Sequence, residues 1–325
     1  MVSSTAEAQT GSTVLVAPKL EDADGRRVPF TLGFKLESTV GQGTFVADEY
    51  ARNSLVVWGV SIAPGYRPTD DLMLSVYAKV TQELTDSDVD TQRQHLALLD
   101  ANMRADYALG TIPVAEIKTG VGLWLYLPTS DVSQFETLML GAALRLTLNR
   151  KLGEHFALDF IGTFRKNFHE YESPVLDASA SSPSPVFIRP GGAEDLAGTL
   201  VAVGANNVSH FFYNIGWVTW MPIEHMAVIL AYGMTNSFTY PTRRDALSSM
   251  YAVDGAGQRD SAVGVIEVAY EIDKRFGIGA GITTASAPKS EDNQSFRFPF
   301  YDFEGTARNL TLFFIDITIS EPLGG

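Results

Sequence analysis

Charged residues recur at every second position in several segments of the chain. Lys35 and Glu37 have this spacing, as do Arg104 and Asp106, and the residue between each pair is apolar. Side chains two residues apart lie on one face of a β-strand, so each pair would project from the same side of a sheet. Acids and bases on one face can form ion pairs, or they can create a local field that orients a polar solute.

The complete set of these charges lies opposite apolar faces of predicted strands. Its members are Lys35, Glu37, Lys79, Asp100, Arg104, Asp106, Glu116, Lys118, Arg145, Asp159, Arg165, Glu267, Glu271 and Asp316. Acids and bases are nearly balanced in this set. We therefore favour a network of ion pairs that braces the interior, because buried charges persist chiefly when paired. The alternative is a selectivity constriction built from opposed rows of acids and bases.

The segment from Glu116 to Leu127 shows most clearly which element positions these charges. Its odd-numbered positions are mostly apolar, whereas Glu116, Lys118, Gly120 and Gly122 occupy even positions. A period of two indicates a strand with two different faces. At about 3.3 Å per residue the segment would be roughly 35 Å long, which is enough to cross a bilayer when tilted.

Twelve segments of the chain share this alternation. They are Phe30–Glu37, Leu55–Ala63, Leu72–Thr81, Leu99–Leu109, Glu116–Leu127, Leu138–Leu148, Phe156–Arg165, Phe211–Trp217, Met226–Phe238, Ala262–Ile272, Phe276–Ala285 and Asn309–Ser320. The connections after even-numbered segments are short, and those after odd-numbered segments are long. This predicts an all-β, up-and-down antiparallel barrel with short turns at one end and long loops at the other.

Composition limits the class of protein further. The 325 residues contain no Cys, which excludes disulfides, thiolate catalysis and zinc-thiolate sites. A formal charge of -14 argues against nucleic-acid binding. There is no run of about 18 apolar residues, so membrane-spanning helices are not expected.

Barrel size indicates which face points inward. About eight strands already enclose an interior that side chains just fill, so twelve strands with apolar faces inside would leave a cavity. We therefore expect the apolar faces to contact lipid and the charged faces to line a wet lumen. Aromatic residues near strand ends, among them Tyr66, Tyr107, Phe156, Trp217 and Tyr270, would form interfacial girdles. A soluble β-sandwich is the alternative.

With these features the chain resembles the outer-membrane β-barrel proteins of Gram-negative bacteria, in particular their porin-like, twelve-stranded members. The resemblance covers about Phe30 to Ser320 and rests on architecture. It implies an integral outer-membrane barrel over residues 29–320, with its long loop at 168–209, in contact with outer-membrane lipid and lipopolysaccharide. Residues 1–28 would be a periplasmic tail or short plug, and residues 321–325 a C-terminal tail, with both termini in the periplasm.

The expected function is passive passage of small polar solutes, without a cofactor and without enzymatic activity. One alternative is an occluded barrel that anchors a multiprotein complex of the cell envelope. A third is an outer-membrane lipid hydrolase, for which Ser209 beside His210 is the candidate pair, although neighbouring strand residues point to opposite faces.

Two further groups of residues are candidate sites. His169 and His210 are predicted at the outer ends of neighbouring strands, both pointing inward, where they could form a metal site at the rim. Phe296, Phe298, Phe300, Tyr301 and Phe303 form an aromatic cluster in the last large loop. We expect this cluster to pack back over the barrel mouth, or alternatively to form an outer patch that binds a ligand or partner.

Overall fold

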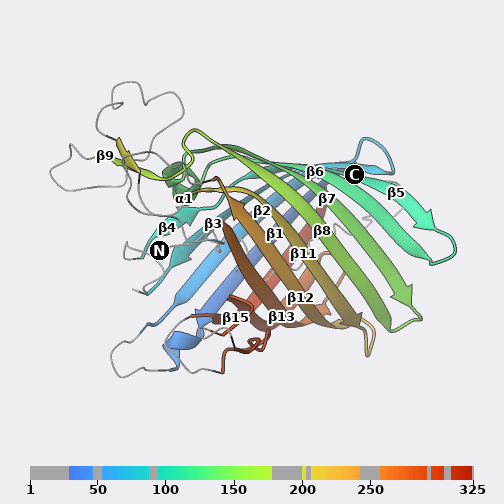
Figure 1. Cartoon of the computed structure of the whole chain (residues 1–325). Helices are drawn as coiled ribbons and strands as arrows, with labels where there is room; N and C mark the ends of the chain where they lie inside the picture. The colour runs from blue at the N-terminus through green and yellow to red at the C-terminus, as the bar shows by residue number, and fades with distance from the viewer. Residues whose placement is uncertain are drawn as a thin grey trace.

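The computed structural model describes residues 29–46, 53–85, 87, 94–177, 200–202, 206–241, 257–290, 294–303 and 309–323. Within these residues, twelve antiparallel strand positions close into a barrel (Figure 1), which confirms the predicted fold class. The first and last strands complete the ring, with Phe30 paired to Leu323 and Gly41 paired to Leu312.

The strands of the barrel follow one another around the wall in chain order. They are β1 (Phe30–Gly41), β2 (Val56–Tyr66), β3 (Leu72–Glu83), β4 (Leu96–Leu98), β5 (Asn102–Ile112), β6 (Ile117–Tyr126), β7 (Leu138–Leu152), β8 (Phe156–His169), β11 (Val208–Trp220), β12 (Met226–Thr239), β13 (Gln258–Glu271), β14 (Phe276–Ser286) and β15 (Thr311–Leu323). Strands β4 and β5 both pair with β3 and share one position in the ring.

Three smaller elements lie at the long-loop end. They are a 3-10 turn η2 (Gln42–Thr44), a short helix α1 (Asp131–Phe135), and a two-stranded ribbon of β9 (Val175–Asp177) with β10 (Leu200–Ala202). Ser130 caps α1 by accepting a hydrogen bond from the Ser133 amide. Figure 1 shows the ribbon beyond the end of the barrel. No helix in the described residues is long and apolar enough to cross a membrane.

The strands present apolar side chains to the outside of the barrel. Large exposed residues of this kind include Leu36, Ile62, Leu123, Leu144, Ile278 and Ile315. The alternate positions are polar or small, and many of them are buried in the interior. A continuous apolar exterior along the strands is stable in lipid, whereas in water it would promote aggregation.

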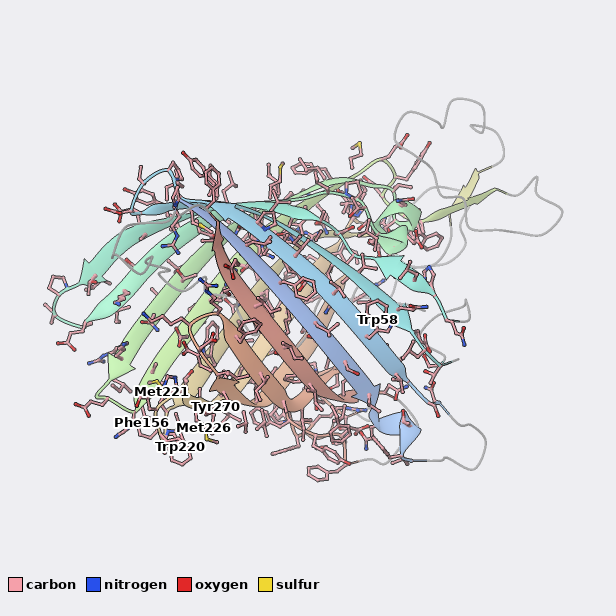
Figure 2. The ribbon with its side chains drawn as sticks, turned by 180° about the vertical axis from the view of Figure 1, so that it is seen from behind. Trp58, Phe156, Trp220, Met221, Met226 and Tyr270 are labelled. Atoms are coloured by element: carbon pink, nitrogen blue, oxygen red, sulfur yellow. The ribbon has the colours of Figure 1, made fainter. Side chains whose placement is uncertain are left out.

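Aromatic side chains gather on the outer wall at the short-turn end. Phe156, Trp220 and Tyr270 lie there together with Met226, whereas Trp58 lies toward the opposite end (Figure 2). Phe156 pairs with Trp220 and Met226 pairs with Tyr270, so the group forms a band across β8, β11, β12 and β13. This band is in the place expected for an interfacial girdle.

The predicted orientation of β11 was wrong. Its apolar residues Tyr213, Ile215 and Trp217 point into the barrel, where they pack against a buried apolar cluster from β12, β13 and β15. Trp217 therefore does not belong to the girdle. The alternating pattern correctly indicates two faces for this strand. The apolar face does not contact lipid here, because this sector of the barrel interior is itself apolar.

Some predicted boundaries also differ. Glu116 lies in the turn before β6 with a φ of 55°, instead of opening the strand. Strand β15 continues to Leu323, so residues 321–323 belong to the barrel. Residues 1–28 lie outside the described residues, as does most of the 168–209 loop beyond Asp177 and before Asn206.

The register fixes how the strands are inclined. Following the paired residues around the ring gives a shear of about 16 residues over twelve strands, which corresponds to a tilt of about 40°. This tilt brings residues that are distant in register to the same height along the barrel axis.

Candidate functional site: two charged walls inside the barrel

One wall of the interior carries a cluster of acids and lysines, which we call the acid-lysine cluster (Lys35, Glu37, Lys79, Glu267 and Asp316). Lys35 Nζ lies 3.2 Å from a Glu37 carboxylate oxygen and 3.1 Å from one of Asp316. Lys79 Nζ contacts the other Glu37 oxygen at 2.9 Å. All five residues are buried. The cluster therefore joins β1, β3 and β15 by interactions that water screens only weakly.

Two glycines make room for this cluster. The space above Gly279 is occupied by carboxylate oxygens of Glu267 and Asp316, which would lie 2.9 and 3.0 Å from an added Cβ atom. The Lys79 side chain crosses above Gly59 in the same way, at 3.0 Å. Two acidic side chains thus converge over β14, and Lys35 contacts Asp316.

The opposite wall carries arginines that stack on aromatic rings, which we call the arginine-aromatic wall (Tyr77, Arg104, Trp124, Tyr126, Arg145 and Arg165). Arg104 and Arg145 lie 4.1 and 4.3 Å from the centre of the Trp124 ring. Arg104 also lies 4.6 Å from the centre of Tyr77. Arg165 lies 3.8 Å from the centre of Tyr126. Stacking of this kind holds a guanidinium in place and keeps its charge.

Small residues and polar neighbours fix the arginine-aromatic wall. The Trp124 indole donates a hydrogen bond of 3.0 Å to Asp106, and both side chains lie over Gly122. The Arg165 guanidinium lies against Gly141 and donates a 2.7 Å hydrogen bond from Nε to Asn167. Each glycine leaves the space that a large inward side chain of the next strand fills.

The two walls face each other across the interior. Strand β7 stands opposite β15 in the ring, and β5 stands opposite β13. With the tilt included, the register places Arg145 at the height of Asp316, and Arg104 at the height of Glu267. A ring at mid-barrel therefore has carboxylates on one side and guanidinium groups on the other.

The remaining sector of this ring is apolar. Ala231, Val263, Val265 and Phe314 form a buried cluster, against which the inward residues of β11 pack. The interior is thus divided into an acidic, a cationic and an apolar sector. Opposed charges in a confined space of low dielectric produce a field across the axis, and such a field orients a dipolar or charged solute.

The other predicted lumen charges lie away from this ring. Asp159 accepts a 2.6 Å hydrogen bond from Asn149 nearer the short-turn end. Lys118, Glu116 and Glu271 are exposed at the same end. Asp100 lies between β4 and β5, where it accepts hydrogen bonds from the Ser130 amide and the Ser133 hydroxyl and so supports α1.

Sequence reasoning missed the aromatic members of the ring. Trp124 and Tyr126 occupy the same strand parity as Gly120 and Gly122, and this spacing alone would have placed them inside the barrel. Both residues lie under arginines that the sequence did assign to the interior.

The two predicted rim histidines do not come together. His169 is on the inward face of β8, with its ring edge-on to Tyr240, while His210 points outward and stacks on Phe238 with ring centres 5.0 Å apart. The described residues contain no group of three or more potential metal ligands. The prediction that both histidines point inward was wrong, because it followed from the reversed orientation of β11.

Ser209 and His210 form a hydrogen-bonded pair. Ser209 Oγ lies 2.8 Å from His210 Nδ1, where the register of β11 shifts between Val208 and His210. The shift brings two adjacent side chains within reach of each other, which regular strand geometry would prevent. Ser209 is buried, so a lipid substrate would have limited access to its hydroxyl.

The aromatic loop lies against the outer wall of the barrel instead of over its mouth. An added Cβ at Gly264, which faces outward on β13, would meet the Pro299 carbonyl and the Phe300 ring. The Asp302 amide donates a 2.8 Å hydrogen bond to the hydroxyl of Thr311, another outward position. Phe298 and Phe303 have ring centres 5.5 Å apart, as part of one continuous aromatic cluster.

Comparison with known proteins identifies the fold. No family model matches the sequence, and no curated protein sequence matches it. Among solved structures, an outer membrane channel from Pseudomonas putida F1 superposes with a TM-score of 0.54 at 11% identity, covering 91% of this chain and 97% of the channel.

Two porins show weaker similarity. NanC porin gives a TM-score of 0.45 at 8% identity, covering 90% of this chain and 100% of that protein. KdgM porin gives 0.41 at 8% identity, covering 89% and 98%. The closed ring of twelve antiparallel strands and its superposition on the Pseudomonas putida channel together show the fold of an outer-membrane β-barrel.

Proposed function

We propose that this protein is an outer-membrane channel for passive passage of small polar solutes, and that its mid-barrel ring is the selective constriction. The observation that carries the proposal is the placement of Arg104 and Arg145 opposite Glu267 and Asp316 at one height. A solute that passes between these walls would align its dipole with the field between them. The shared fold with an outer membrane channel supports the same function.

The arginine-aromatic wall favours anionic solutes. Arg104 and Arg145 lack a carboxylate within ion-pair distance among the described residues, whereas Glu37 and Asp316 on the other wall are in contact with lysines. Two cationic side chains at this height therefore face the lumen without being neutralised by direct contact with an acid. Guanidinium groups bind carboxylate and phosphate well because their planar array of donors matches the oxygens.

A liposome-swelling assay tests passage directly. Vesicles that contain the refolded protein should swell in isotonic solutions of small polar solutes, faster for a small carboxylate than for a neutral sugar of similar size. Protein-free vesicles and vesicles with heat-denatured protein are the controls. No swelling with any solute, while folding is confirmed by heat-modifiable gel mobility, would reject the channel.

A second function is favoured by the deep burial of the acid-lysine cluster. Ion pairs that join β1, β3 and β15 brace the wall, and a wall braced by buried charges suits an occluded barrel that anchors a multiprotein envelope complex. Purification from native membranes in mild detergent distinguishes the two functions. A defined partner in fixed stoichiometry, together with absence of swelling, would support the anchor.

The proposed orientation places the first residue of β1, Phe30, and the last residue of β15, Leu323, on the periplasmic side. The short turns lie at that end and the long connections lie at the other, as in bacterial barrels generally. A cysteine introduced at exposed Gln258, at the long-loop end of β13, should react with an impermeant maleimide on intact cells, whereas one at Pro68 should react only after the outer membrane is permeabilised. The reverse pattern would show the opposite orientation.

A further inference from the structure

The connection between β14 and β15 covers a section of the outer wall that lacks large side chains. One cross-strand row on the outer face runs from Tyr232 through Gly264 and Thr284 to Thr311. Tyr232 is an exposed aromatic residue of the kind found at membrane interfaces, whereas the other three positions are small. On β13, β14 and β15 this row therefore presents no large side chain of its own to lipid.

Residues 294–303 of this connection, which we call the outer aromatic loop, fill that section. Pro299 and Phe300 lie against Gly264, and Asp302 binds Thr311 through its amide. Thr284 and Thr311 are 2% and 0% exposed although both face outward, and their hydroxyls lie 3.2 Å apart. The loop thus covers two hydroxyl groups that would otherwise face lipid at a cost in free energy.

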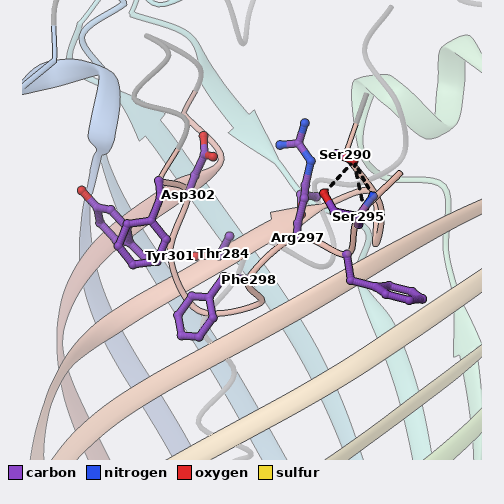
Figure 3. A pocket seen from close by; sticks show the side chains of 10 residues that line it. Thr284, Ser290, Ser295, Arg297, Phe298, Tyr301 and Asp302 are labelled. Carbon is purple, nitrogen blue, oxygen red and sulfur yellow. Dashed lines mark hydrogen bonds between the residues drawn. The ribbon is translucent and has the colours of Figure 1, made fainter. Parts of the chain in front are cut away.

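A second attachment holds the loop to the strand next to β15. Gln42, which directly follows β1, donates a 2.9 Å hydrogen bond to the Asp302 carbonyl. Ser290, which precedes the loop in the same connection, accepts hydrogen bonds from the amide and the hydroxyl of Ser295 (Figure 3). These contacts fix the position of the aromatic rings relative to the wall.

The exposed surface of the loop is strongly apolar and has cations at its margin. Phe296, Phe298 and Phe303 are 80%, 52% and 72% exposed. Lys289 pairs with Phe296 across an isolated bridge, and Arg297 donates a hydrogen bond to the Lys289 carbonyl. Aromatic rings beside lysine and arginine match the boundary between acyl chains and phosphate headgroups.

The height of the loop agrees with such a position. On β12 and β13, apolar outward residues such as Tyr232 and Ile266 give way to Asn236 and Asp260 toward the long-loop end. Gly264, which contacts the loop, lies between these apolar residues and the polar pair Asn236 and Asp260. The exposed rings are therefore continuous with the lipid-facing surface of the barrel, at its outer edge.

We propose that the outer aromatic loop covers this section of the wall and binds the lipid surface around the barrel, at the level where acyl chains meet phosphate headgroups. The loop acts as an attachment on the outside of β13, β14 and β15, separate from the lumen. Its lipid contact does not depend on whether the barrel conducts.

Site-directed spin labelling tests this proposal with little interference, because the natural chain has no Cys. A nitroxide is attached at Phe298→Cys or Phe303→Cys, and the protein is refolded into phosphatidylethanolamine and phosphatidylglycerol vesicles. Collisions with oxygen, which concentrates in lipid, are compared with collisions with a water-soluble nickel chelate. Labels at both loop positions should favour oxygen, whereas a label at exposed Gln258 should favour nickel.

A matched pair of glycine variants tests whether the accessibility of the label depends on contact between the loop and the outer wall. Gly264→Val places a side chain where Pro299 lies and should displace the loop, which would turn the label at position 303 from oxygen-accessible to nickel-accessible. Gly216→Val is the control, because it also faces outward on the wall but meets only the Asp159 carbonyl at 3.6 Å. That variant should leave the label unchanged.

Two outcomes would overturn the proposal. Labels at 298 and 303 that collide with nickel as freely as the label at 258 would place the loop in water. Spin-spin broadening that disappears on dilution with unlabelled protein would show that a second copy of the chain, and not lipid, covers the rings.

Discussion

At the scale of single residues, the interior is organised by which charges are paired. Lys35 contacts both Glu37 and Asp316, whereas Arg104 and Arg145 are held by the Trp124 ring. An ion pair neutralises its members, but a stacked guanidinium keeps its full charge toward the lumen. The acid-lysine cluster is therefore expected to contribute mainly to stability, and the arginine-aromatic wall mainly to selectivity.

Replacing Lys35 with Met tests the first role. The buried Asp316 carboxylate would lose the ammonium group 3.1 Å away, and breaking a buried pair in this way costs about 3–5 kcal/mol. Urea unfolding of the vesicle-refolded protein measures the free energy. Lys151→Met, at an exposed position near a turn, should change it by less than about 0.5 kcal/mol. Equal effects of the two variants would contradict a structural role for the cluster.

Replacing Arg145 with Gln tests the second role. Loss of one guanidinium at the constriction should lower the preference for anions, which is read as a shift of the reversal potential under a salt gradient. Lys118→Gln removes the same charge at the exposed short-turn end and should shift the potential much less. A shift of the same size in both variants would mean that net lumen charge, and not the ring, sets selectivity.

At the scale of elements, the sequence predicts which segments form strands and how they are spaced. It does not always predict which face of a strand points into the barrel. All twelve strands follow from alternation and from the lengths of the connections. In β11, however, alternation identified the two faces of the strand without showing which one meets lipid. The face with Tyr213, Ile215 and Trp217 packs on the buried apolar cluster of β12, β13 and β15, a contact between strands that no local pattern reveals.

Cysteine accessibility tests the orientation of β11. A cysteine at Thr219, on the inward face near the short-turn end, should react with a water-soluble thiol reagent in vesicles. A cysteine at Val218, on the outward face, should be protected by lipid. Protection of position 219 with reaction at 218 would restore the orientation first expected from the sequence.

At the scale of the whole molecule, the closed ring brings together residues that are far apart in the chain. Asp316 and Arg145 come to one height only because twelve tilted strands close with a particular shear. The sequence predicts that both are inside, but it cannot predict that they face each other, since this depends on every register around the barrel. The same limit explains why the pairing of Lys35 with Asp316 could not be predicted, whereas the presence of many inward acids and bases in nearly equal number could.

Single-channel recording in a planar bilayer tests the central claim most directly. Purified, refolded protein added to one chamber should produce discrete conductance steps, with a reversal potential that favours anions under a potassium chloride gradient. The Arg104→Gln/Arg145→Gln variant should still conduct and should lose that preference, because the aromatic residues and the acid-lysine cluster remain. Folded protein that inserts without any conductance steps would contradict the account and show that the charged walls close the barrel.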